Sequence, residues 1–167
     1  MTGGIHVTRH GWMAYAIAAA VLVLDQLSKF WVLDVLRLEE GRPIEVLPFF
    51  RLSMVWNKGV SFGLFRADTD SMRWVLVGFA VVVVLALLWW AGRQTRRLPA
   101  LALGLIIGGA LGNNLIDRVR FGSVADFLDF SGLYFPWVFN VADSGITVGV
   151  VLLLLDSFLH KEPEPET

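Results

Sequence analysis

Four long stretches of the chain carry no charged side chain, and the charged residues gather between them and at the ends. The charge-free stretches are residues 10–24, 74–92, 98–116 and 144–155. A helix needs about 20 mainly apolar residues to cross about 30 Å of hydrocarbon. The middle two stretches are long enough alone, and the outer two become so when a few flanking residues are included. The pattern therefore predicts four transmembrane helices, at about 12–33, 72–92, 98–116 and 141–159.

Two of the predicted helices carry further membrane signals. Gly104, Gly108 and Gly112 recur every fourth residue in the third helix, a spacing that lets membrane helices approach closely. Trp89 and Trp90 close the second helix, where aromatic side chains suit the membrane interface. No small-residue cleavage site follows the first span, so we expect it to remain as a transmembrane helix rather than a removed signal peptide.

The segments between the helices predict the topology. Residues 37–70 alternate weakly between apolar and polar side chains and contain two prolines, which indicates short strands and turns. Four spans place residues 37–70 and 117–140 on one side of the membrane and both termini on the other. The short loop at 93–97 (RQTRR) carries three arginines, which favours the cytoplasm for that side, although the opposite side holds more Lys and Arg in total.

Composition excludes several classes of protein. The chain is 56% hydrophobic and 17% charged, with a mean hydropathy of +0.63, whereas a soluble domain is about 45–50% apolar and about 25% charged. A soluble globular domain and a disordered chain are therefore excluded. The net charge of −1 points to no nucleic-acid partner. Cysteine is absent and the three histidines lie near the ends, so we expect no metal site.

A few polar residues lie inside or at the edges of the predicted helices, where they are costly and suggest function. Asp25 and Lys29 lie four residues apart on one helix face and can form an ion pair, which could be structural or functional. Asn114, Asp117 and Arg118 close the third helix, where the simplest interpretation is a polar exit from the membrane.

Asp126 and Asp143 are the candidates for catalysis. Two neighbouring carboxylates resist ionising together, so one keeps its proton. The ionised group can then take a proton from water while the protonated group polarises a carbonyl. A structural alternative exists for Asp143, because Asn140 and Asp143 have the spacing of a capping box at the start of the last helix.

Two other functions are weighed against this one. A serine–lysine mechanism would need Ser28 with Lys29, which point to different helix faces, or Lys58 with Ser61, in a glycine-containing segment typical of a turn. A non-enzymatic protein, such as a small transporter subunit or a proton relay, would also use buried carboxylates. The two halves of the chain show no internal repeat of the kind that transporters often have.

Five short motifs, spread over about residues 12–159, resemble the lipoprotein signal peptidase (signal peptidase II) family in type and order. They are Asp25-Gln26-Leu27-Ser28-Lys29, Asn57-Lys58-Gly59-Val60-Ser61-Phe62-Gly63, Asn114-Leu115-Ile116-Asp117-Arg118, Val124-Ala125-Asp126-Phe127 and Phe139-Asn140-Val141-Ala142-Asp143. Each motif is weak alone, but five in order on a four-span pattern are specific. One departure is visible, since Gly112-Asn113-Asn114 holds one residue more than the family's usual Gly-Asn. Either Asn113 or Asn114 could take the family's asparagine role, and the spacing to Asp117 favours Asn114.

The resemblance implies a fold and an activity. The fold is a single integral membrane domain, residues 1–167, mainly α: a four-transmembrane-helix bundle with a small extracytoplasmic β-cradle and a short amphipathic helix. The activity is that of an aspartyl endopeptidase that removes the signal peptide of prolipoproteins, cutting before the diacylglyceryl-modified cysteine. The implied catalytic residues are Asp126 and Asp143. Residues that line or support the site are Asn57, Gly59, Asn114, Arg118 and Asn140, and structural ones are Asp25, Lys29 and Asp117.

The resemblance also implies partners and a location. The partners are the diacylglyceryl-modified prolipoprotein, membrane lipids and a globomycin-type inhibitor, with no cofactor, metal or nucleic acid. The location is the bacterial inner membrane, with both termini in the cytoplasm and the active site towards the periplasm. Which aspartate acts as the base does not follow from the sequence.

Overall fold

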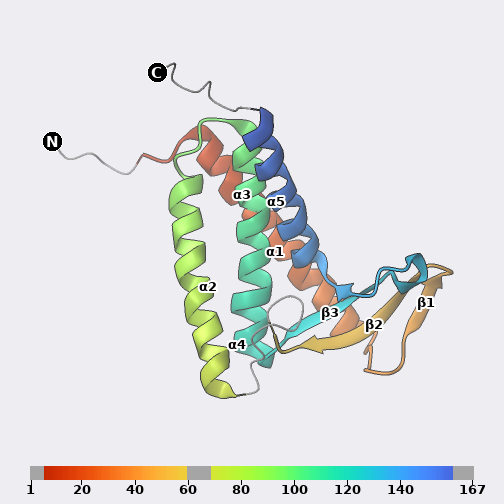
Figure 1. Ribbon diagram of the computed structural model, residues 1–167. Coiled ribbons are helices and arrows are strands. Elements are labelled where there is room, and N and C mark those ends of the chain that lie inside the picture. Colours follow the sequence, from red (N-terminus) through yellow and green to blue (C-terminus); the bar gives the residue numbers. More distant parts are fainter. Residues whose placement is uncertain (1–5, 60–68, 160–167) are drawn as a thin grey trace, which may run out of the picture.

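Four long helices form a bundle, and a small sheet projects sideways from one end of it (Figure 1). The structure, a computed structural model, describes residues 6–59 and 69–159. The long helices are α1 (Arg9–Phe30), α2 (Asp70–Ala91), α3 (Arg97–Ala110) and α5 (Val141–Leu159). Two of them are prolonged by further turns, namely the π-helical η1 (Trp31–Val35) after α1, and the π-helical η3 (Leu111–Asp117) with the short α4 (Arg118–Phe121) after α3.

These helices confirm the four predicted spans. Each is long and apolar enough to cross a membrane, and the first and third extend over Arg9–Val35 and Arg97–Phe121. The first three helices start up to three residues before the predicted positions, and the first and third also end later, at Val35 and Phe121, whereas α5 has the predicted bounds. Capping, rather than charge, sets where a helix starts. The side chain of Thr8 accepts a hydrogen bond from the Gly11 backbone N–H and starts α1.

α3 is the central helix, and glycines let its neighbours approach it. A Cβ atom at Gly104 would lie 2.6 Å from the carbonyl oxygen of Ala14, and one at Gly108 would lie 2.6 Å from that of Ala18. Real Cβ atoms do not approach other atoms so closely, so α1 can pack here only against glycine. The close helix approach predicted from the four-residue spacing is confirmed.

The sheet has four antiparallel strands in the order β1-β2-β3-β4. They are β1 (Ile44–Leu47), β2 (Phe50–Asn57), β3 (Val124–Asp129) and β4 (Val138–Phe139). The strands predicted within 37–70 supply half of the sheet, and the segment 117–140 supplies the other half. All but one of the β3 residues are buried, so this strand lacks the apolar–polar alternation by which a half-exposed strand is recognised. Residues 37–59 contain no helix, and residues 60–68 lie outside the described residues.

The sheet is held against the end of α1 by a small apolar core. Val32 and Leu38, just after α1, pack against Leu52 of β2 and Phe127 of β3. In the register of β2 and β3, Val55 lies opposite Asp126, and Asn57 lies opposite Val124. The sheet therefore brings Asp126 from one loop segment and Asn57 from the other to the same end of the bundle.

Replacing Gly108 by alanine should lower the thermal stability strongly, because the new methyl group would collide with the backbone of α1 at Ala18. Gly78 in α2 offers a matched control, since a Cβ atom there meets no atom of the described residues within 4 Å. Gly78→Ala should be neutral or stabilising by up to about 1 kcal/mol, through helix propensity. Thermal unfolding of the two variants in detergent tests this difference, and equal melting temperatures would contradict the packing.

Candidate active site

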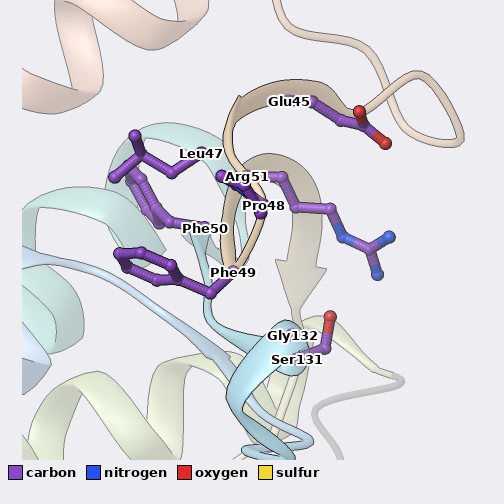
Figure 2. A pocket seen from close by; sticks show the side chains of 8 residues that line it. All are labelled: Glu45, Leu47, Pro48, Phe49, Phe50, Arg51, Ser131 and Gly132. Atoms are coloured by element: carbon purple, nitrogen blue, oxygen red, sulfur yellow. The ribbon is translucent and has the colours of Figure 1, made fainter.

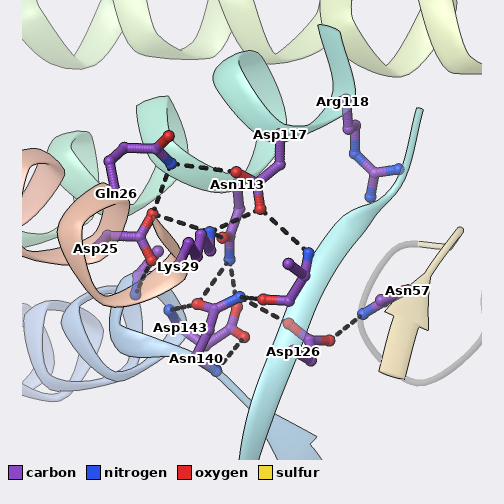
Figure 3. A network of polar contacts seen from close by, with 12 residues as sticks. Asp25, Gln26, Lys29, Asn57, Asn113, Asp117, Arg118, Asp126, Asn140 and Asp143 are labelled. Atoms are coloured by element: carbon purple, nitrogen blue, oxygen red, sulfur yellow. Dashed lines mark hydrogen bonds and ion pairs between the residues drawn. The ribbon is translucent and has the colours of Figure 1, made fainter. Parts of the chain in front are cut away.

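A network of polar side chains fills the bundle where it meets the sheet (Figure 3). It draws on α1, β2, η3, α4, β3 and the start of α5, and its members are Asp25, Gln26, Lys29, Asn57, Asn113, Asp117, Arg118, Asp126, Asn140 and Asp143. Most of these side chains are fully or almost fully buried. Buried polar groups of this kind are tolerated only when they bind one another.

Lys29 is the cation at the centre of the network. Its Nζ lies 2.8 Å from Asp25 Oδ2 and 2.7 Å from Asp117 Oδ2. It also donates a hydrogen bond of 2.6 Å to Asn113 Oδ1. The ion pair of Asp25 and Lys29 predicted from their spacing is present, and a second carboxylate from η3 joins it.

The two carboxylates that bind Lys29 also bind the backbone of other elements. Asp25 Oδ1 accepts a hydrogen bond of 3.0 Å from the backbone N–H of Ala142, in the first turn of α5. Asp117 Oδ2 accepts one of 3.1 Å from the backbone N–H of Ala125 in β3. Gln26 Nε2 donates to both carboxylates at 3.1 Å. These contacts tie α1, η3, β3 and α5 together directly beside the two candidate catalytic residues.

Asn140 connects Asp126 with Asp143. Its Nδ2 donates a hydrogen bond of 2.6 Å to Asp126 Oδ1, and its Oδ1 accepts one of 2.9 Å from the backbone N–H of Asp143. Asp143 Oδ2 in turn accepts one of 3.2 Å from the backbone N–H of Asn140. This is the capping box considered in the sequence. The cap therefore orients the carboxylate of Asp143 towards the same asparagine that holds Asp126.

Asp126 is buried and receives a second hydrogen bond of 3.0 Å from Asn57 Nδ2. Burial, together with the nearby carboxylate of Asp143, raises the pKa of Asp126 to about 7. The hydrogen bonds from Asn57 and Asn140 act in the opposite direction but do not outweigh burial. Asp126 therefore holds a proton at pH values where an ordinary aspartate is ionised.

The sequence left open whether Asn113 or Asn114 takes the family's asparagine role, and the structure describes the contacts of both. Because Lys29 binds Asn113 Oδ1, the Nδ2 of Asn113 faces Asp143 Oδ1 at 2.8 Å and Asn140 Oδ1 at 3.2 Å. Asn114, which the spacing favoured, instead accepts a long hydrogen bond of 3.4 Å from Arg118 Nε.

The sequence signal that could have pointed to Asn113 was the additional residue in Gly112-Asn113-Asn114, before the Asp117-Arg118 pair. The segment that contains it is the π-helical η3, and a π-helical turn fits one residue more than an α-helical turn. Both Asn113 and Asp117 turn into the network within this segment. Gln26, which sequence reasoning assigned no role, joins Asp25 to Asp117.

Arg118 borders the site from the side of β2. Its Nη2 donates a hydrogen bond of 2.6 Å to the carbonyl oxygen of Gly59, whose backbone N–H donates to Asn57 Oδ1. Arg118 Nη1 is buried and has no hydrogen-bond partner among the described residues. A guanidinium donor without a partner is available to a bound carbonyl or carboxylate.

The groups weighed for other chemistries lie differently. Ser28 Oγ donates to the backbone oxygen of Asp25 and does not take part in the Lys29 contacts that the structure records. Ser61, the partner considered for Lys58, lies outside the described residues. Within residues 6–59 and 69–159, no group of three or more His, Cys, Asp or Glu could hold a metal ion.

Comparison with known proteins assigns the family. The family model described as signal peptidase (SPase) II matches residues 17–159. The chain belongs to the signal peptidase II family. The family assignment confirms the resemblance seen in the five motifs and makes the chain a multi-pass membrane peptidase. The alternative of a transporter subunit or proton relay gains no support.

Individual relatives agree with the family assignment. A lipoprotein signal peptidase of Caulobacter vibrioides is 59% identical over 158 residues, which cover 95% of this chain and 94% of that protein. One of Beijerinckia indica is 48% identical over 150 residues, covering 87% and 89% of the two chains. A solved bacterial membrane enzyme superposes with a TM-score of 0.76 at 29% identity, covering 93% and 94%. The predicted fold of four membrane helices and a small sheet is confirmed.

Replacing Asp25 by asparagine should mainly lower stability. The substitution removes one of the two carboxylates bound to buried Lys29, and breaking a buried ion pair costs about 3 kcal/mol or more. Thermal unfolding should therefore begin at a clearly lower temperature than in the unchanged protein. Peptidase activity per folded molecule, measured well below that temperature, should change little. Loss of activity at unchanged stability would show that Asp25 has a direct part in the reaction.

Proposed function

We propose that the chain is an aspartyl endopeptidase that removes the signal peptide from prolipoproteins, cutting before the diacylglyceryl-modified cysteine. The observation that carries the proposal is the pair of carboxylates, Asp126 and Asp143, joined by hydrogen bonds to one buried asparagine, Asn140. The names of the relatives, lipoprotein signal peptidases, support the substrate class.

The surroundings of the two aspartates favour different roles. Asp143 lies in the first turn of α5, where the helix dipole stabilises an anion. Its two oxygens accept hydrogen bonds from Asn113 and from the backbone of Asn140. Asp126 is almost fully buried and its pKa is raised to about 7, so it can hold the shared proton. We assign Asp143 as the base that activates water and Asp126 as the acid that faces the substrate carbonyl.

The proton transfers balance over one cycle. Asp143 takes a proton from water as the oxygen attacks the scissile carbonyl, and Asp126 gives its proton to the carbonyl oxygen. The tetrahedral intermediate then collapses: Asp143 gives its proton to the leaving amine, and Asp126 regains one from the hydroxyl group that becomes the new carboxyl. Each aspartate returns to its starting state.

Groups around the dyad suit the binding of a peptide. Arg118 Nη1 is a buried donor without a partner among the described residues and can bind a backbone carbonyl of the substrate. Gly59 contacts both Arg118 and Asn57, and Asn57 and Asn140 each hold Asp126. A globomycin-type cyclic peptide would occupy this position, in competition with the substrate.

The proposed location follows from the spans. The short, arginine-rich turn between α2 and α3 lies at the end of the bundle opposite the sheet (Figure 1). Placing that turn in the cytoplasm puts both termini in the cytoplasm and the dyad towards the periplasm. The acyl chains of the substrate then stay in the bilayer of the inner membrane while its scissile amide reaches the dyad.

Asp126→Asn and Asp143→Asn should each reduce cleavage of a diacylglyceryl-cysteine peptide on the order of 10³-fold, because each removes one of the two proton-transfer groups. Asp34, an exposed aspartate in η1, provides the control, and Asp34→Asn should cleave normally. The assay uses purified protein in detergent, with thermal unfolding to verify that each variant is folded. Near-normal turnover by either dyad variant would refute the assignment.

Activity should also fall as the pH rises above about 7. The active form holds one proton on the dyad, and the raised pKa of Asp126 means that this proton leaves near pH 7 rather than near pH 4. The value of kcat/KM should then decrease towards tenfold per pH unit on the alkaline side. A profile that stays flat to pH 9, while the protein remains folded, would contradict the assignment of the proton to Asp126.

A further inference from the structure

The far end of the sheet is built from two turns that pack against each other. One turn joins β1 to β2 and contains Phe49, and the other is the 3₁₀ turn η4 (Ser131–Leu133) after β3. A Cβ atom at Gly132 would lie 2.6 Å from Phe49 Cα, so only glycine permits this contact. The two turns therefore form one unit. Together with Leu47 and the residues after η4 up to Trp137, they are here called the sheet tip.

The sheet tip presents large apolar side chains outwards. Its exposed members are Leu47, Phe49, Leu133, Tyr134, Phe135 and Trp137. Tyr134 is 98% exposed and has a φ of 59°, which is uncommon for a residue other than glycine. The rings of Phe135 and Trp137 contact each other with centroids 5.3 Å apart. Large apolar side chains that gather in this way mark a site of interaction rather than a surface that faces water.

The tip has two chemically different sides. Figure 2 shows Leu47, Phe49 and Phe50 pointing to one side and Glu45 and Arg51 to the other. A small cavity of about 240 Å³ lies among these residues.

The polar side continues along the sheet. Glu45 lies opposite Arg51, and Arg51 lies opposite Asp129, so three ionisable residues form a row across β1, β2 and β3. Arg51 Nε binds Asp129 Oδ2 at 2.6 Å. An apolar side backed by a row of charges is the pattern of an element that lies in the interface plane of a membrane.

The position of the tip relative to the helices agrees with a place at the membrane interface. The sheet extends sideways from the bundle, and the start of α2 lies further from the bundle centre than the sheet does (Figure 1). Near that end of α2, Trp74 is 54% exposed and its ring binds Arg73 at 5.0 Å, as expected of an anchor at the membrane surface. Since a membrane-spanning helix continues past the sheet, the tip lies at the depth of the lipid surface.

We propose that the sheet tip inserts its apolar side into the interfacial layer of the bilayer, with lipid as its partner. Tyrosine and tryptophan favour this layer, where the ring is apolar and the polar group stays hydrated. The tip then extends the lipid-facing surface of the helices beyond the bundle. Because β3 carries Asp126, a tip anchored in lipid holds one of the two dyad residues at a fixed depth.

The absence of cysteine makes a clean test available. A single nitroxide is attached to Tyr134→Cys, and the full chain is placed in vesicles of phosphatidylcholine and phosphatidylglycerol. Collision with oxygen, which dissolves in lipid, is compared with collision with a water-soluble nickel complex. Two matched labels provide references: Phe79→Cys on the outer face of α2, where Phe79 is 69% exposed, and Glu45→Cys on the polar side of the sheet.

The label at 134 should show an oxygen-to-nickel collision ratio well above that at 45 but below that at 79, because Phe79 lies near the middle of the membrane-spanning α2. A ratio equal to that at 45 would place the tip in water and overturn the proposal. Low collision with both reagents would mean that protein covers the tip. Spin–spin broadening that disappears on dilution with unlabelled chain would then identify a second copy as the occupant, which also overturns it.

Discussion

A lysine buried between two carboxylates determines how the parts of this protein meet. Lys29 lies within 3 Å of both Asp25 and Asp117, away from water. Any one of these charges buried alone would cost several kcal/mol, so the three can be buried only together. Asp25 also binds the first turn of α5, and Asp117 binds β3. The need to compensate charge thus becomes a constraint on tertiary structure, because α1, η3, β3 and α5 must converge on one point.

The same constraint shapes the chemistry of the dyad. Burial and the carboxylate of Asp143 oppose a negative charge on Asp126, and the attraction of nearby Lys29 does not outweigh them. One proton stays on the dyad in consequence, and we assign it to Asp126. The amide group of Asn113 joins Lys29 to Asp143, because its oxygen accepts a hydrogen bond from Lys29 and its nitrogen donates one to Asp143.

Local signals predicted much of the fold, and contacts between distant segments decided the rest. The four spans follow from composition alone, because any long apolar helix avoids water in the same way. β3 escaped prediction because the helices and the neighbouring strands bury both of its faces. Asp126 and Asp143 drew notice as polar residues in apolar surroundings, and the resemblance to a family made their suggested pairing specific. Asn113 was one of two candidates, and only the π-helical turn explains why it points inwards.

The sequence by itself determined the number of spans, the four-residue glycine spacing of α3, the Asp25–Lys29 pair and the capping box at Asn140. Apart from the spans, which follow from composition, these features depend on residues within one or two helical turns of each other, where spacing dictates which side chains share a face. Tertiary structure alone decided that Asp117 joins Lys29, that Asn57 and Asn140 hold Asp126, and that aromatic side chains from two loop segments gather at the sheet tip. Those contacts join segments up to about a hundred residues apart, and hydrogen bonds over such separations leave no periodic trace in the chain.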